Sequence, residues 1–244
     1  TVNYNGAGAQ NIRVPSDASY HHLTISGSGT KLLLGAADVN GTVSILGTAA
    51  LNVNSFNITL GGNWNNNSTS PDPFIEGIQT VTLDGGAAQT IDAALAQETF
   101  YNLTIANTSG GISLIGSTDV GVANLLTFTS GVVTTGLNLL ILSNTAAANL
   151  VYTNGFVNGT FRRFIASNAS TYLFPVGNGI TAADRHKVGF VNNSLTGTTA
   201  LDVSVTDFIQ SAPNNDANLS TTHWGTPITS TAGEVAGQTV IWTI

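Results

Sequence analysis

The sequence predicts an all-β protein: a parallel β-helix or closely related solenoid, followed by a smaller β-sandwich-like module. Three observations support this prediction. The chain contains an internal duplication, its apolar segments are very short and separated by turn residues, and its composition changes near residue 166. Short repeated strands with no room for crossover helices are typical of solenoids, in which each repeat packs on its neighbours.

The duplication involves two similar copies of a unit of about 80 residues, which would hold roughly four coils of a β-solenoid. The spacing between matched segments hardly changes along the unit, which indicates duplication rather than similar composition. We therefore predict one solenoid over residues 1–166. The matched segments are 1–12 with 80–91, 20–25 with 100–105, 38–39 with 119–120, and 57–60 with 138–141.

Within each unit, Gly, Asn, Ser or Asp occupies every gap between apolar segments, as expected for strands joined by tight turns. No window holds a helical period over three turns. A right-handed parallel β-helix would bury the inward side chains of these strands against neighbouring coils. A stack of antiparallel sandwiches is the alternative that short strands also allow. The strands expected in the first unit are residues 23–25, 32–34, 43–45, 51–53 and 58–60.

The composition changes from Phe161 onward, where basic residues and prolines reappear. The expected strands there are longer and more alternating, at residues 187–191, 200–205 and 239–244. Longer alternating strands favour a sandwich, so we predict a second module over residues 167–244. Because the sequence stops inside an expected strand, we expect further chain beyond Ile244.

Composition excludes several classes of protein. Charged residues make up 8% of the chain, but no segment approaches the roughly 20 apolar residues of a membrane-spanning helix. Cysteine is absent, which excludes disulfides and cysteine nucleophiles. The net charge is −7, and no Lys or Arg lies between Lys31 and Arg162. Such a surface repels phosphate backbones, so we expect no nucleic-acid partner.

Candidate catalytic and metal sites are few, and we expect a non-catalytic protein. His21 and His22 are adjacent, and neighbouring strand residues point to opposite faces, so they should not share one ion. Residues 184–187 form the densest charge cluster, but no nucleophile-elbow pattern accompanies it. Asp202 and Asp207 could form a carboxylate pair of the kind glycosidases use, yet neither belongs to a larger acidic cluster.

No cofactor is expected, with calcium as a weak possibility. Asp38 and Asp119 occupy equivalent positions in the two copies. A turn aspartate that bonds its own backbone explains this equivalence better than a calcium site does. Arg162 and Arg163 are expected to flank the junction between the modules, with one of them paired to an acid.

The candidate ligand-binding residues are Trp64, Asn65 and Trp224. Trp64 lies beside a run of asparagines, and Trp224 follows His223. An indole ring stacks on sugars and amides bind their hydroxyl groups, so both places could bind glycans. The alternative is that each Trp packs over the edge of the solenoid.

Several linked segments occur in a fixed order along the chain: the Gly62-Asn63-Trp64 turn, residues 80–83, 88–91 and 100–105, and a closing region at 158–165 and 172–177. This order resembles a recurrent pattern in very large secreted surface proteins of Bacteroidota. The resemblance implies an adhesin-like protein exported by the type IX route, and therefore an extracellular or cell-surface location.

Taken together, these features predict a structural or adhesive segment of a bacterial surface protein, acting as a stalk or filament subunit. A glycan-binding adhesin module is the alternative, and a polysaccharide lyase or hydrolase is a third reading. The expected partners are neighbouring chain or further solenoid repeats, glycans, and other copies of the chain joined end to end. No membrane span is expected.

Overall fold

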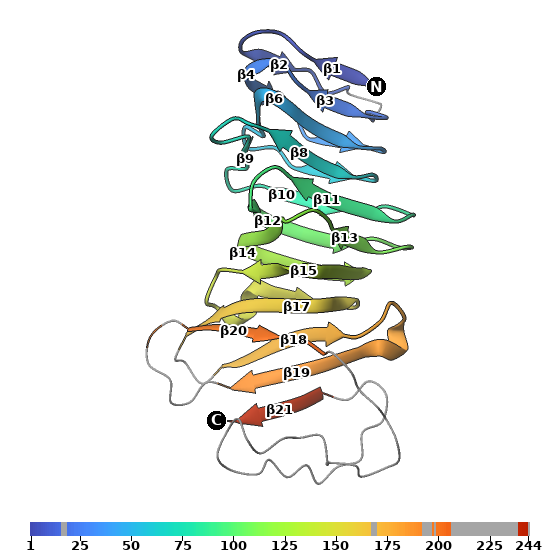
Figure 1. The fold of residues 1–244 in the computed structure, drawn as a ribbon, viewed down its shortest axis with the longest axis vertical. Helices are drawn as coiled ribbons and strands as arrows, with labels where there is room; N and C mark the ends of the chain where they lie inside the picture. The colour runs from blue at the N-terminus through green and yellow to red at the C-terminus, as the bar shows by residue number, and fades with distance from the viewer. Residues whose placement is uncertain (16–18, 167–169, 192–196, 198, 206–238, 244) are drawn as a thin grey trace.

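A computed structural model describes residues 1–15, 19–166, 170–191, 197, 199–205 and 239–243. It confirms the predicted fold class: the chain is nearly all β and winds into a parallel β-solenoid of about 8 turns. The strands stack along one long axis from the N-terminus downward (Figure 1). Helical structure among these residues is limited to two short 3₁₀ turns, η1 (Ala147–Asn149) and η2 (Ala182–Asp184). In the described part of the chain no helix could cross a membrane.

The strands form three sides, which the chain visits in the order 1, 2, 3. Side 1 contains β1 (Val2–Tyr4), β3 (Leu23–Ile25), β8 (Trp64–Ser68), β11 (Gln89–Ala93), β13 (Ile112–Leu114) and β18 (Thr171–Gly177). Side 2 contains β2 (Gln10–Ile12), β4 (Ser28–Leu33) and β9 (Phe74–Ile75). Side 3 contains β5 (Ala37–Val39), β7 (Ile58–Leu60), β10 (Thr80–Leu83) and β16 (Leu150–Tyr152).

Five longer strands bend around a corner and belong to two sides each. From side 1 to side 2 run β6 (Val43–Asn52), β15 (Val132–Leu142) and β17 (Phe156–Ile165). From side 2 to side 3 run β12 (Gln97–Ala106) and β14 (Asp119–Ser130). The bend in β6 falls at Gly47, whose φ of 70° suits glycine and whose added Cβ would lie 2.8 Å from the carbonyl oxygen of Gly27.

Apolar side chains fill the interior because successive residues of a strand point to opposite faces. The short strands of side 3 alternate buried and partly exposed residues, and the buried ones align from coil to coil. Such ladders supply most of the stabilisation of a solenoid, since each coil contacts only its neighbours. One ladder on side 3 runs Val39, Leu60, Leu83, Ile105 and Phe128.

The two copies of the repeat do not lie on the same sides. β1 is on side 1, whereas β10, which matches it in sequence, is on side 3. β2 is on side 2, and its match β11 is on side 1. The unit therefore ends one side short of the four complete coils that its length suggested. Matched segments of the two copies therefore lie on different sides of the solenoid.

The parallel pairing continues past residue 166. β18 still pairs parallel with β17, and the direction changes at β19 (Arg185–Val191), which runs antiparallel to β18. β20 (Thr199–Val203) is antiparallel to β17, and β21 (Thr239–Thr243) is parallel to β19. These strands extend the sheet of the solenoid. The sandwich-like module over residues 167–244 stays a prediction, because residues 206–238 lie outside the described ranges.

Candidate functional site

The ladder of side 2 is interrupted between β9 and β12. Pairing runs from β2 through β4 and β6 to β9, and resumes from β12 to β14, but in the described ranges no register joins β9 to β12. Pro71 and Pro73 lie just before β9, and proline has no N–H to donate to a neighbouring strand. The coil that carries them is longer than its neighbours, and it leaves an opening in the wall.

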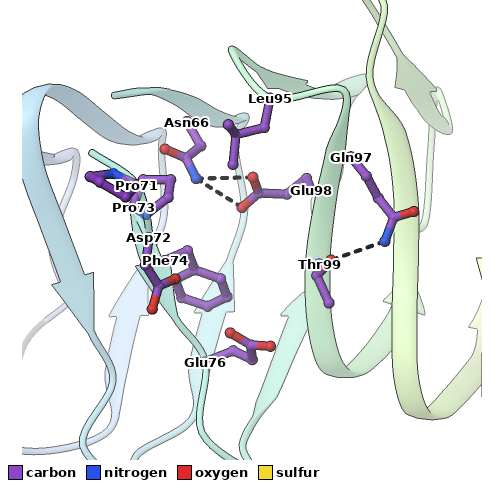
Figure 2. Close-up of a pocket in the computed structure, with 10 residues that line it drawn as sticks. All are labelled: Asn66, Pro71, Asp72, Pro73, Phe74, Glu76, Leu95, Gln97, Glu98 and Thr99. Carbon is purple, nitrogen blue, oxygen red and sulfur yellow. Dashed lines mark hydrogen bonds between the residues drawn. The ribbon is translucent and has the colours of Figure 1, made fainter. Parts of the chain in front are cut away.

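A pocket of about 270 Å³ occupies this opening. Its polar wall consists of Asn66 from β8, Asp72 and Glu76 from the β9 region, and Gln97, Glu98 and Thr99 from β12. Phe74, Leu95 and the two prolines supply the apolar wall. Figure 2 shows these side chains, with the amide of Asn66 facing the carboxyl group of Glu98. The pocket thus combines three carboxyl groups, two amides and a hydroxyl group with an aromatic ring.

Glu98 is the unusual residue of this pocket. It occupies an inward position of β12, in register with buried Val120 on the next coil, and only 2% of its surface is exposed. Its Oε1 accepts a hydrogen bond from Trp64 Nε1 at 2.8 Å, and both carboxyl oxygens accept from Asn66 Nδ2, at 3.1 and 2.9 Å. An acidic group therefore stands where the neighbouring coils place apolar residues.

Trp64 and Asn66 are positioned for Glu98 by the alternation of β8. The strand points both side chains inward, and Asn66 follows Ile45 in an otherwise apolar ladder. The Trp64 ring packs edge-on against Phe74 and Phe100, at centroid distances of 4.7 and 5.3 Å. The Oδ1 atom of Asn66 is buried and has no hydrogen-bond partner. Such an unsatisfied acceptor is costly inside a protein.

Burial determines the electrostatics of the pocket. It raises the pKa of Glu98 to about 7, an effect that the hydrogen bonds from Trp64 and Asn66 oppose and the negative charge of Glu76 reinforces. The pKa of Glu76 is raised as well, mainly by burial and further by the charge of Asp72. Because no Lys, Arg or His occurs between Lys31 and Arg162, no neighbouring coil supplies a compensating cation.

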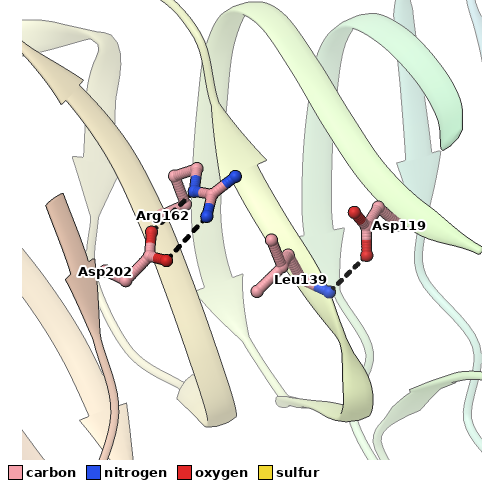
Figure 3. A network of polar contacts seen from close by, with 4 residues as sticks. All are labelled: Asp119, Leu139, Arg162 and Asp202. Carbon is pink, nitrogen blue, oxygen red and sulfur yellow. Dashed lines mark hydrogen bonds and ion pairs between the residues drawn. The ribbon is translucent and has the colours of Figure 1, made fainter. Parts of the chain in front are cut away.

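The structure shows no candidate metal site among the residues that it describes. In those ranges, no group of three or more His, Cys, Asp and Glu is placed to hold a metal ion. Asp119, which was considered for calcium, lies in a strand, and its Oδ1 accepts from the backbone N–H of Leu139 on the next coil at 2.8 Å (Figure 3). Asp38 lies in β5 and is exposed. Neither residue sits in a turn, contrary to our expectation.

The residues expected to bind sugars fare differently. Trp64 is 0% exposed, so its ring offers no face to a sugar, and the expected stacking there gives way to packing in the core. Asn65 lies beside it in β8 but is half-buried and points outward. Trp224 and His223 lie outside the described residues. The sequence analysis did not single out Asn66 or Glu98, although both are polar residues at inward positions of their strands.

The adjacent histidines do not point to opposite faces as expected. They lie in a bend before β3, and their ring centroids are 4.3 Å apart. The Nδ1 atom of His22 accepts a hydrogen bond from the backbone N–H of Thr42 at 2.8 Å, which ties this bend to the next coil. The alternation rule failed here because it holds only within a regular strand.

The expected ion pair at the arginines is present. Arg162 donates to both carboxylate oxygens of Asp202, at 2.6 and 2.7 Å, and joins β17 to β20 (Figure 3). Arg163 is buried, donates to the carbonyl oxygens of Leu173 and Ala147, and lies 5.3 Å from the ring centroid of Tyr172. Asp202 is thus committed to a structural contact. Asp207, its suggested partner, lies outside the described residues.

The charge cluster at residues 184–187 is also structural. Asp184 accepts hydrogen bonds from the backbone N–H and hydroxyl of Thr181, both at 2.8 Å, and caps η2. Lys187 lies over the ring of Tyr152, 5.1 Å from its centroid. These contacts close the turn that leads into β19.

Comparisons with protein-family models, curated proteins and solved structures gave no match. The pocket and the solenoid itself are therefore the basis for assigning a function.

Proposed function

We propose that this chain is a non-catalytic, extended segment of a bacterial surface protein, acting as a stalk or filament subunit outside the cell. The observation that carries this proposal is the continuous pairing of side 1, which runs parallel from β1 to β18. A stack held together only by nearest-neighbour contacts gives length and stiffness in proportion to its number of coils.

The ends and the surface support the same proposal. In the described structure β1 pairs with β3 and β2 pairs with β4, so each has one edge that can accept a further strand. Open edges are templates for pairing with more chain, either further solenoid repeats or another copy. The outward positions are mainly uncharged Thr, Ser and Asn, which keep the rod hydrated without attracting nucleic acid.

A glycan-binding adhesin module is the second candidate, and one feature of side 3 favours it. Its outward positions carry a threonine on four consecutive coils, in direct register: Thr59, Thr82, Thr104 and Thr127. Neighbouring strands lie about 4.8 Å apart, so these hydroxyl groups form a regular row suited to the hydroxyls of an extended polysaccharide. Glycan-array binding by the wild type, and its loss in a Thr82→Val, Thr104→Val double variant, would support this role.

The stalk or filament proposal is tested by electron microscopy of the purified chain over a series of concentrations. Rod-shaped particles whose length matches a single stack of coils are expected at low concentration. End-to-end fibres at high concentration would identify a filament subunit. Isolated rods at every concentration would contradict self-assembly and support the role of a stalk. Compact round particles would contradict the proposal as a whole.

A further inference from the structure

The acidic pocket beside β9 departs from the apolar packing of the adjacent coils. At this place the chain buries a carboxyl group and leaves the Oδ1 of Asn66 without a partner. Apolar residues at these inward positions would continue the ladders of the adjacent coils, as Val120 does beside Glu98. The departure from the solenoid pattern therefore calls for an occupant.

The polar groups that line the pocket specify the chemistry of that occupant. Asp72, Glu76, Glu98 and the unpartnered Asn66 oxygen are hydrogen-bond acceptors that favour a positively charged donor. No basic side chain lines the pocket. The Phe74 ring and two prolines add an apolar wall, and an aromatic face attracts organic cations. A volume of about 270 Å³ accommodates a small group rather than a polymer chain.

A metal ion fits these observations less well. The described carboxyl groups are not arranged as a metal-binding set, and part of the wall is apolar. Calcium takes six to eight oxygen ligands, a set that these carboxyl groups do not form. An ammonium group needs only two or three acceptors and tolerates a carbon skeleton against Phe74.

We propose that the pocket formed by Asn66, Asp72, Phe74, Glu76 and Glu98 binds a small organic ammonium group, such as that of an amino sugar or an alkylamine. The ammonium group donates to Glu98, Glu76 and the unpartnered Oδ1 of Asn66, while its carbon atoms contact Phe74 and Leu95. The site is independent of whether the rod acts as a stalk or a filament.

Titration with glucosamine, followed through the indole N–H resonance of Trp64, tests this proposal because that N–H donates to Glu98. We expect a saturable shift with a Kd on the order of 1 mM. N-acetylglucosamine, the same sugar without the charge, should cause no shift. Butylammonium tests whether the ammonium group alone suffices for binding. Of these two cationic ligands, the one that binds more tightly indicates whether the natural ligand is an amino sugar or an alkylamine.

Variants separate the pocket from general surface charge. Glu98→Gln keeps the shape of the side chain and should weaken glucosamine binding at least about tenfold, which corresponds to 1.4 kcal/mol. Glu76→Gln should weaken it too, and it serves as the second variant if Glu98→Gln alters the fold. Asp84→Asn removes the same charge from an exposed residue at the end of β10 and should bind as the wild type does.

Three results would overturn the proposal. Equal binding of N-acetylglucosamine would show that charge is not recognised. A shift with calcium that displaces glucosamine would assign the pocket to a metal ion. Absence of any shift with glucosamine and butylammonium, in a protein whose Trp64 resonance is resolved, would show that the pocket does not recognise an ammonium group.

Discussion

The two copies of the repeat build the same corner from different partners. In the first copy, Gln10 accepts a hydrogen bond from the N–H of Gly6 at 2.8 Å, and in the second, Gln89 accepts from Gly85 at 2.9 Å. The backbone carbonyl groups at this corner accept hydrogen bonds from different side chains in the two copies. Lys31 donates to Gly6 and Gly8 in the first copy, whereas Asn107 donates to Ala87 in the second.

This difference shows that the turn is encoded locally and the side of the solenoid is not. A glutamine four residues after a glycine closes the corner on side 2 in one copy and on side 1 in the other. The surroundings then determine how much each residue contributes. Gln89 also donates to the carbonyl groups of Leu60 and Gly62 on the preceding coil, and it is fully buried, whereas Gln10 is half-buried.

The largest expected effect comes from removing the buried glutamine. Gln89→Ala leaves the N–H of Gly85 without its acceptor and removes a donor from the carbonyl groups of Leu60 and Gly62, and should lower the free energy of unfolding by about 3 kcal/mol. Gln10→Ala removes the same local bond at a solvated position and should cost about 1 kcal/mol. Urea unfolding of both variants measures the difference. Equal losses would contradict the view that the preceding coil makes the corner of the second copy stronger.

The second copy alone carries Glu98, and its pKa of about 7 gives stability a dependence on pH. The native state holds this proton up to about pH 7, whereas an unfolded glutamate loses it near 4.5. The free energy of unfolding should therefore fall as pH rises between these values, by about 2 kcal/mol from pH 5 to pH 8. Glu76 faces the same pocket and shifts in the same direction, while Asp72 is exposed.

Glu98→Gln should abolish most of that fall, because a Gln side chain stays neutral and can donate to Asn66 once the Asn66 amide turns over. Urea unfolding at pH 5 and pH 8 compares the variant with the wild type and with Asp84→Asn, which should keep the wild-type dependence. An unchanged dependence in Glu98→Gln would assign the effect to other groups.

A variant of Lys31 tests how much this residue stabilises the corner of the first copy. Lys31 is buried and donates to the carbonyl oxygens of Gly6 and Ser28 at 2.8 Å, and also to that of Gly8. Lys31→Met keeps the length of the side chain and removes the donors, and should cost about 1 kcal/mol because these carbonyl groups can be rehydrated at the edge. Hydrogen exchange should speed up at residues 1–12 and stay unchanged from β10 onward. Faster exchange along the whole chain would mean that the coils do not unfold independently of one another.

The smallest effect is expected at the end of the solenoid. The hydrogen bonds from Arg162 lower the pKa of Asp202, but both side chains are substantially exposed, so the pair is screened by solvent. Asp202→Asn should lower the free energy of unfolding by less than about 1 kcal/mol at pH 7. The loss should vanish at high salt, and a loss that persists there would point to packing rather than charge.

The fold could be predicted because its signals are local and repeated. Short apolar strands, turn residues in every gap and the duplication all indicate a solenoid, and each is visible without knowing which residues meet. The side on which each copy lies depends on the lengths of all preceding coils, including the long one with Pro71 and Pro73. Small errors in coil length accumulate, so the side could not be read from one unit.

The pocket could not be predicted for a related reason. Trp64 was considered as a sugar-binding residue because it lies beside a run of asparagines, but it begins β8 and points inward. Glu98 and Asn66 come from strands on different sides of the solenoid, and their side chains meet only because both point into the interior. Their inward polar positions were the available signal, and that signal depends on knowing where each strand begins.

The rotation of the repeat between copies has a consequence for how such a rod would grow by duplication. If copies were added in tandem with the same spacing, each would begin one side away from the copy before it. A copy would lie on the starting side again only after the other two sides had been occupied. No flank would accumulate the same side chains along its whole length. A rod decorated in this screw-like manner offers no continuous strip for side-by-side bundling, while the same epitope remains reachable from all around.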